Sequence, residues 1–320
     1  MALGEFELID RYFRRPVRRA ALGVGDDCAL LQPRAGMQLA VSTDLLVEGR
    51  HFLSTVAPAR LGHKALAVNL SDLAACGAEP LAFTLALSMP AVREDFLAPF
   101  AQGLLALADA NGIELVGGDT TAGPLSIAIT VFGEVPPGQA LLRSGARVGD
   151  ELWLSGTLGD ARLALEAFRG QVQLSGEGFE QARRAMELPQ PRVALGLALR
   201  GIASAAIDLS DGLLGDLGHV LRRSGCGATL YFDALPRSAL LAAQPLALQR
   251  TCLLTGGDDY ELLLAAPAAR HDHMLAAANQ TGVALTCVGR VEDAAQGLRV
   301  LDASGQALNL QGLAAFDHFR

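Results

Sequence analysis

The sequence predicts a globular protein of two domains, each containing helices and strands. Its 320 residues exceed the roughly 250–300 at which a single hydrophobic core stops growing. A Pro136-Pro137-Gly138 stretch marks a linker between residues 1–137 and 138–320. Hydrophobic residues make up 51% of the chain and charged residues 19%, a balance typical of well-packed proteins. Segments with helical spacing alternate with short apolar runs that we expect to be strands.

The composition argues against several classes of protein. The apolar runs are shorter than the roughly 18 residues that a membrane helix needs, and acidic residues near the N-terminus argue against a signal peptide. We therefore expect a cytoplasmic protein with no membrane partner. The five dispersed cysteines form no Cys-x-x-Cys pair, which favours reduced thiols.

The charge of the chain limits its partners. A net charge of −8 argues against a nucleic-acid partner, although nucleotides can bind where divalent metals lie between carboxylates and phosphates. Lys64 is the only lysine, and it lies inside a helical pattern and not after a glycine loop. The sequence therefore excludes a P-loop kinase.

A helix that is apolar on nearly every side is expected from residue 62, and Gly77 ends it before a strand at 81–89. Asn69 and Asp72 lie three residues apart and therefore share one side of this helix. A carboxylate in such surroundings needs a cation, a metal ion or several hydrogen-bond donors. We expect Asp72 to have such a partner.

Further acidic residues follow glycines or expected strands in the first half of the chain. They are Asp26 and Asp27 before an expected strand at 28–31, Asp44 after Ser42-Thr43, and Asp119 in an expected Gly117-Gly118 loop before a strand at 125–131. Ordinary capped turns would explain each one alone, and His51 alone would more often be a surface histidine. Carboxylate and hydroxyl oxygens are also the ligands that magnesium prefers, and glycine lets a backbone approach a ligand closely.

The second half repeats this association of acids with glycines. Asp208 and Asp211 are expected where a strand passes into a helix, in a pattern that resembles the residues around Asp72. Gly256-Gly257 precedes Asp258, Asp259 and Glu261 just before an apolar strand. Arg143 follows the linker and could hold phosphate oxygens, although an arginine beside a linker is usually solvated.

Taken together, these motifs resemble the thiamine-monophosphate kinase family, whose superfamily includes aminoimidazole ribonucleotide synthetase. The resemblance covers nearly the whole chain. Its motifs are Gly4-Glu5-Phe6, Gly25-Asp26-Asp27-Cys28-Ala29-Leu30, Ser42-Thr43-Asp44, the run from Lys64 to Asp72, Gly117-Gly118-Asp119-Thr120-Thr121, Asp208-Leu209-Ser210-Asp211-Gly212 and Gly257-Asp258-Asp259-Tyr260-Glu261.

The resemblance implies an α/β protein of the aminoimidazole ribonucleotide synthetase-like fold. Its N-terminal α+β domain, residues 1–137, would bind ATP and magnesium and pair its sheet with a second subunit in a homodimer. Residues 138–320 would form an α/β C-terminal domain, with the site between the domains. The implied reaction is direct in-line transfer of a phosphoryl group from ATP to thiamine monophosphate with several Mg²⁺ ions, giving thiamine diphosphate.

The resemblance also implies roles for particular residues, none of them a covalent nucleophile. The metal ligands would be Asp27, Ser42, Thr43, Asp44, Asp72, Asp119, Asp208 and Asp211. ATP would contact Gly118, Asp119, Arg143 and Ser210, and thiamine monophosphate would contact His51, Asp258 and Phe316.

One position departs from the family pattern. Asp258 stands where the family is expected to carry glutamate, so Asp259 or a water molecule could replace that contact. Two alternatives stay open. One is another ATP-dependent enzyme of the same superfamily, against which the absence of an N-terminal glycine-rich tail with a reactive cysteine argues. The other is a non-catalytic nucleotide-binding regulator.

Overall fold

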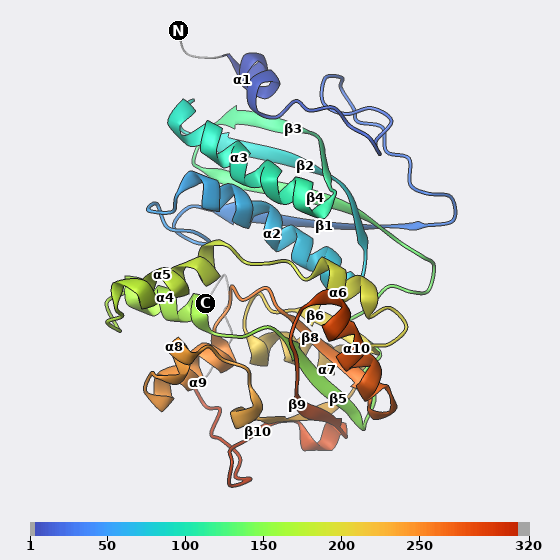
Figure 1. The fold of residues 1–320 in the computed structure, drawn as a ribbon, viewed down its shortest axis with the longest axis vertical. Coiled ribbons are helices and arrows are strands. Elements are labelled where there is room, and N and C mark those ends of the chain that lie inside the picture. The colour runs from blue at the N-terminus through green and yellow to red at the C-terminus, as the bar shows by residue number, and fades with distance from the viewer. Residues whose placement is uncertain (1–3, 313–320) are drawn as a thin grey trace. The chain divides into compact units, whose positions relative to one another are not determined.

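The computed structural model describes residues 4–312, which fall into two compact units (Figure 1). The first unit ends at Gly138, apart from Ala74–Gly77, which groups with the second unit; the second otherwise begins at Gln139. Among the residues described, no helix is long and apolar enough to cross a membrane.

The first unit is a sheet covered by helices on one face (Figure 1). Its strands lie in the order β1-β4-β2-β3; β4 is antiparallel to both of its neighbours, and β2 and β3 are parallel. The elements in chain order are α1 (Glu5–Tyr12), β1 (Gln38–Val47), α2 (Pro58–Cys76), β2 (Glu79–Met89), α3 (Glu94–Asn111), β3 (Glu114–Ala122) and β4 (Ser126–Val135).

Alternation along the strands separates the two faces of this sheet. In β4, Ile127, Ile129 and Val131 are buried, as expected for residues that face the covering helices. On the edge strand β1, Val41 and Leu45 point to the opposite face, where their exposed fractions are 57% and 53%. Ser42 and Asp44 therefore lie on the helix side of β1.

Two glycines allow α2 and α3 to pack closely. A Cβ atom on Gly103 of α3 would lie 1.9 Å from the Ala59 carbonyl oxygen, and one on Gly62 of α2 would lie 2.1 Å from the Phe100 carbonyl oxygen. Real atoms cannot approach so closely, so each side chain would force the helix backbones apart. This close packing fixes α2, which carries Asn69 and Asp72, over the sheet.

The second unit contains a mixed sheet in the order β10-β7-β9-β5-β8-β6. Its core includes Leu152, Ile207 and Leu263 from neighbouring strands. The strands are β5 (Asp150–Ser155), β6 (Ala205–Asp208), β7 (Gly227–Tyr231), β8 (Leu262–Pro267), β9 (Leu285–Glu292) and β10 (Leu298–Leu301). The α-helices are α4 (Asp160–Phe168), α5 (Gly176–Glu187), α6 (Val193–Ala198), α7 (Leu213–Ser224), α8 (Ala239–Ala242), α9 (Leu246–Thr255) and α10 (His271–Thr281).

Two local predictions were wrong. Residues 28–31 form no strand; Leu30 makes only an isolated bridge to Leu22, while Ala29 and Leu31 pack against a small cluster around Leu81. Gly117–Asp119 lie within β3 and not in a loop, with Gly118 opposite Leu85 of β2. Glycine is disfavoured in strands, but here a Cβ on Gly118 would lie 1.8 Å from the Leu85 carbonyl oxygen, and φ is +147°. The close approach of two backbones therefore explains the glycine.

Gly103→Ala should destabilise the protein by about 1–3 kcal/mol, because the added methyl group cannot fit against α2. Urea unfolding followed by circular dichroism measures the loss. The neighbouring exposed residue provides the control, since Gln102→Ala should change the free energy of unfolding by less than about 0.5 kcal/mol. Equal stabilities for the two variants would contradict this account of the helix contact.

Candidate functional site

Polar residues of β1 and α2 meet on the covered face of the first sheet. The Ser42 hydroxyl donates to Asp72 Oδ2 at 2.5 Å, and the Asp44 backbone N–H donates to Asn69 Oδ1 at 3.0 Å. Asn69 Nδ2 in turn donates to the Ala65 carbonyl at 3.0 Å. These contacts confirm that Asn69 and Asp72 share one side of the helix and that Asp72 has a donor partner.

Thr43, between these two residues of β1, points the other way. Its hydroxyl lies 2.8 Å from the Thr130 hydroxyl, and its side chain is exposed. The three adjacent residues Ser42, Thr43 and Asp44 therefore cannot all direct their side chains to one ion, because neighbours in a strand alternate.

The turn after β1 holds His51 by two contacts. Val47 N–H donates to His51 Nδ1 at 3.0 Å, and Lys64 Nζ donates to the His51 carbonyl at 3.2 Å. Because Nδ1 accepts a hydrogen bond, the proton of the neutral ring lies on Nε2. Lys64 is 2% exposed within α2, so the one lysine of the chain fixes this turn from inside the unit.

A cavity of about 700 Å³ opens in the first unit between the N-terminal segment and β3. Gly25, Asp26 and Asp27 line it from the segment, while Gly118 and Asp119 line it from the strand. The structure thus brings two predicted motifs, distant in sequence, to one cavity. Ile9, Phe13, Val24 and Leu115 give the cavity an apolar side as well.

In the second unit, the loops after β6 and before β8 lie together. Asp208 ends β6, and Ser210 and Asp211 precede α7. The Asp258 and Tyr260 backbone N–H groups donate to the Ser210 and Leu209 carbonyls, each at 2.9 Å. These bonds bring the predicted residues Asp208, Ser210, Asp211 and Asp258 into one neighbourhood.

Asp216 adds a further acid at this place. The Asp211 and Gly212 backbone N–H groups donate to its carboxylate at 3.1 and 3.0 Å, which ties the loop to the first turn of α7. Burial, followed by the charge of Asp211, raises the pKa of Asp216 to about 7, and the charge of Arg143 opposes that rise. Arg143 is exposed, and its charge reaches Asp216 beside the loop of residues 208–212.

The other two acids of the Gly257–Glu261 motif have structural partners. Asp259 accepts from the Gly159 N–H at 2.9 Å, at the start of α4, and burial holds the pKa of Asp259 well above its usual value. Glu261 accepts from Arg192 Nε at 2.7 Å and also from the Ser155 hydroxyl. Asp258 accepts from the Tyr260 hydroxyl at 3.2 Å, and its backbone N–H holds it beside the Ser210 loop. Asp259, suggested above as a substitute for the substrate contact, is bound to the start of α4.

The predicted residues are thus divided between the two units. In residues 4–312, no group of three or more His, Cys, Asp and Glu side chains is arranged to hold a metal ion. Phe316 lies outside the described residues.

Comparisons with known proteins find relatives that match the chain over its full length. The family described as AIR synthase related protein matches its N-terminal domain to residues 25–135 and its C-terminal domain to residues 147–300. A thiamine-monophosphate kinase of Salmonella typhimurium is 46% identical over 326 aligned residues, covering 100% of this chain and 99% of the relative. The chain belongs to the thiamine-monophosphate kinase family.

Two solved structures share the fold. A crystal structure of thiamine-monophosphate kinase from Stenotrophomonas maltophilia aligns with a TM-score of 0.86 at 46% identity, covering 96% of this chain and 99% of that one. A structure of AaThiL complexed with AMPPCP and TMP aligns with a TM-score of 0.77 at 28% identity, covering 90% of this chain and 89% of that one. The two-domain fold predicted from the motifs is confirmed.

For this thiamine-monophosphate kinase family member, Asp258 has a local physical reason to be aspartate. Its φ is +69°, in the left-handed region, where aspartate is tolerated better than residues with longer side chains. Tyr260 also has a positive φ of +50°. Residues other than glycine in this region are held there by their surroundings and gather at functional sites.

Asp259→Asn should flatten the pH dependence of stability. The unfolded chain ionises this residue near pH 4, whereas the folded chain resists ionisation, so stability contributed at low pH is lost as pH rises from about 4 toward the raised folded pKa. Urea unfolding between pH 4 and 7 should show a smaller decline for the variant. A decline as steep as that of the unsubstituted protein would show that Asp259 ionises normally.

Proposed function

We propose that the chain transfers the γ-phosphoryl group of ATP to thiamine monophosphate, giving thiamine diphosphate and ADP. The observation that carries this proposal is the full-length similarity to thiamine-monophosphate kinases, in which both motif-bearing halves are matched. AaThiL, which shares the fold, was solved with TMP and AMPPCP, an ATP analogue. Since ATP is consumed, we place the reaction in the cytoplasm.

The oxygen donors of the first unit fit magnesium. Ser42, Asp44 and Asp72 supply a hydroxyl and carboxylates, the hard ligands that this ion prefers. Magnesium is commonly bound by one or two carboxylates, water and substrate phosphates, so no cage of three acidic side chains is required before ATP binds. When bound, the ions would neutralise the charge of the phosphate groups.

We assign the remaining ligands from their positions, either at the cavity of the first unit or in the loop of residues 208–212. Asp27 and Asp119 face the cavity of the first unit and would bind metal beside the nucleotide. Gly118 lines the same cavity and would contact ATP there. In the second unit, Asp208 and Asp211 would hold further metal, while Ser210 and Arg143 would contact ATP.

Thiamine monophosphate would contact His51, Asp258 and Phe316. The Nε2–H of His51 can donate to a phosphate oxygen, because Val47 N–H occupies Nδ1. Asp258 is one methylene shorter than glutamate, and its fixed backbone would set the direction of its carboxylate. Phe316 could stack on the cationic thiazolium ring, which an aromatic face attracts.

The chain's own residues mainly hold the reactants in line. The attacking phosphate oxygen of thiamine monophosphate is already ionised, so neither a covalent nucleophile nor a strong base is needed. Phosphoryl transfer then depends on positioning and on neutralising charge. Arg143 and the His51 Nε2–H supply donors for phosphate oxygens.

Asp72→Asn should abolish turnover while leaving the fold intact, because asparagine keeps the shape of aspartate and its hydrogen bond from Ser42 but loses the charge that metal binding needs. ADP and thiamine diphosphate formation from ATP, thiamine monophosphate and Mg²⁺ measures this. A control is the exposed Asp95, paired with Arg93 at the start of α3; Asp95→Asn should keep full activity.

The same assay tests the function itself. Replacing thiamine monophosphate by formylglycinamidine ribonucleotide or by selenide should give no product. Turnover of either compound, or wild-type turnover by Asp72→Asn at saturating Mg²⁺, would contradict the assignment.

We also propose a homodimer that buries the side of β1 that faces away from the helices. Leu39, Val41 and Leu45 expose 45%, 57% and 53% of their surfaces along the edge strand β1, a row of apolar side chains that a second copy could cover.

Val41→Asp should shift the protein from dimer to monomer in analytical ultracentrifugation, because a buried unpaired carboxylate opposes association. Leu246→Asp, at a similarly exposed leucine of α9, should leave the mass unchanged. A Val41→Asp variant that stays dimeric at low micromolar concentration would exclude this face as the interface.

A further inference from the structure

The loop that carries Asp27 lies in a long segment without regular structure. Between α1, which ends at Tyr12, and β1, which begins at Gln38, the chain forms only isolated bridges, such as Leu22 to Leu30. A segment of this kind has many conformations to lose when it is fixed in place. Gly25, Asp26 and Asp27 line the cavity, and the packing of Ala29 and Leu31 against the Leu81 cluster is joined by polar contacts at the two ends of the loop.

The start of the loop is bound by a carboxylate on the sheet. Glu114, the first residue of β3, accepts from the backbone N–H groups of Arg18, Arg19 and Ala20, at distances between 2.7 and 3.2 Å. Hydrogen bonds to a charged acceptor are stronger than those between neutral groups. The chain therefore enters the loop from a fixed position on β3.

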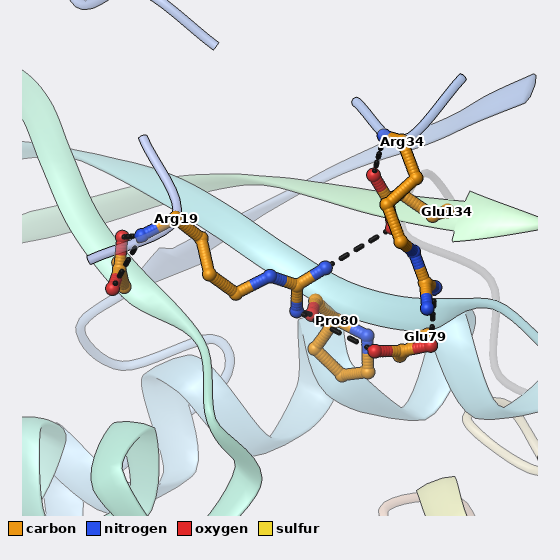
Figure 2. Close-up of polar contacts among 6 residues, drawn as sticks. Arg19, Arg34, Glu79, Pro80 and Glu134 are labelled. Atoms are coloured by element: carbon orange, nitrogen blue, oxygen red, sulfur yellow. Dashed lines mark hydrogen bonds and ion pairs between the residues drawn. The ribbon is translucent and has the colours of Figure 1, made fainter. Parts of the chain in front are cut away.

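The end of the loop meets the start at a second carboxylate (Figure 2). Glu134 of β4 accepts from Arg34 N at 2.6 Å, from Arg34 Nε at 2.7 Å and from Arg19 Nη2 at 3.1 Å. Arg19 Nη1 donates to the Pro80 carbonyl at 2.7 Å, and both arginines pair with Glu79 of β2. Figure 2 shows the two arginines of the segment converging on Glu79 and Glu134 from opposite sides.

Burial gives this contact its strength. The Glu134 side chain is 1% exposed, while its partners Arg34 and Arg19 are 54% and 31% exposed. Water therefore screens this contact less than an ion pair in which both partners are exposed. Burial would raise the pKa of Glu134, but the Arg34 N–H and the two guanidinium groups together lower it, so the charged form is favoured. Removing one arginine would leave a buried charge with fewer donors, and a pair of this kind is costly to break.

We propose that Arg19, Arg34 and Glu134 are positioning residues that close the 19–34 loop and hold Asp27 at the nucleotide cavity. They are not catalytic residues, because they act through the loop. A similar ion pair in the same segment closes no loop: Arg15 pairs with Asp109 of α3 at 3.0 Å, with both side chains exposed. The inference rests on the proposed role of Asp27 in binding the magnesium nucleotide.

The test compares Arg34→Gln, Arg34→Lys and the control Arg15→Gln in the full-length protein. Hydrogen exchange of peptides spanning 20–31 reports loop opening without ligand, and calorimetry with AMPPCP and Mg²⁺ reports nucleotide affinity. We expect Arg34→Gln to speed exchange and to weaken AMPPCP, each by about 10-fold or more, because small misplacements have effects of this order. The KM for thiamine monophosphate should change by less than about 2-fold, and exchange in peptides of β5 and β8 should stay unchanged.

Arg34→Lys keeps the charge but can make only one of the two side-chain contacts, so it should lose less than Arg34→Gln in both measurements. Arg15→Gln should show neither effect. Faster exchange with unchanged AMPPCP affinity would overturn the proposal, because the contact would then stabilise the loop without affecting nucleotide binding. An equal loss of AMPPCP affinity in Arg15→Gln would also overturn it. Glu134→Gln provides a second route to the same result, should Arg34→Gln fold poorly. Asp27→Asn separates the two hypotheses: wild-type affinity for AMPPCP with Mg²⁺ in that variant would refute the role of Asp27, while exchange in Arg34→Gln still reports whether the loop is held.

Discussion

The burial of carboxylates is the constraint on which this structure depends. A chain with a net charge of −8 places several acids where water cannot solvate them, and each buried acid needs donors to remain tolerable. Glu134 has two arginines and Glu261 has Arg192 and Ser155, while the partly buried Asp259 has the N–H at the start of α4. These pairs tie loops to strands, so the same interactions that satisfy the acids also set the positions of the site loops.

This constraint divides the acids into two groups. Those with arginine or backbone partners, such as Glu114 and Glu261, fix the frame and have no spare capacity for ligands. On the site side, Asp72 accepts from the Ser42 hydroxyl, and Asn69 accepts from the backbone N–H of Asp44. These neutral contacts place the residues of β1 and α2 beside each other.

Local patterns predicted the parts of the fold that depend on neighbours in sequence. The apolar run from residue 62, ended by Gly77, predicted α2 and its polar side. The acidic motifs indicated residues that could share a site, but not which of them meet. The roles of Asp259 and Glu261 were beyond such reasoning, because their partners Gly159 and Arg192 are distant in sequence. Gly118 led to a wrong prediction for another reason. Glycine indicated a loop, but glycine is needed at this position of β3 because the β2 backbone lies too close for a side chain.

The single lysine of the chain is consistent with a site built from acidic residues. A P-loop enzyme places a lysine at the phosphates, but here the one lysine is buried under the His51 turn. Cations must therefore come from arginines or from solution, and the arginines Arg19, Arg34 and Arg192 are committed to buried acids. In the proposed reaction, an acidic binding surface would repel a free nucleotide and accept one that carries divalent metal, so the charge of the protein would favour the metal complex of ATP.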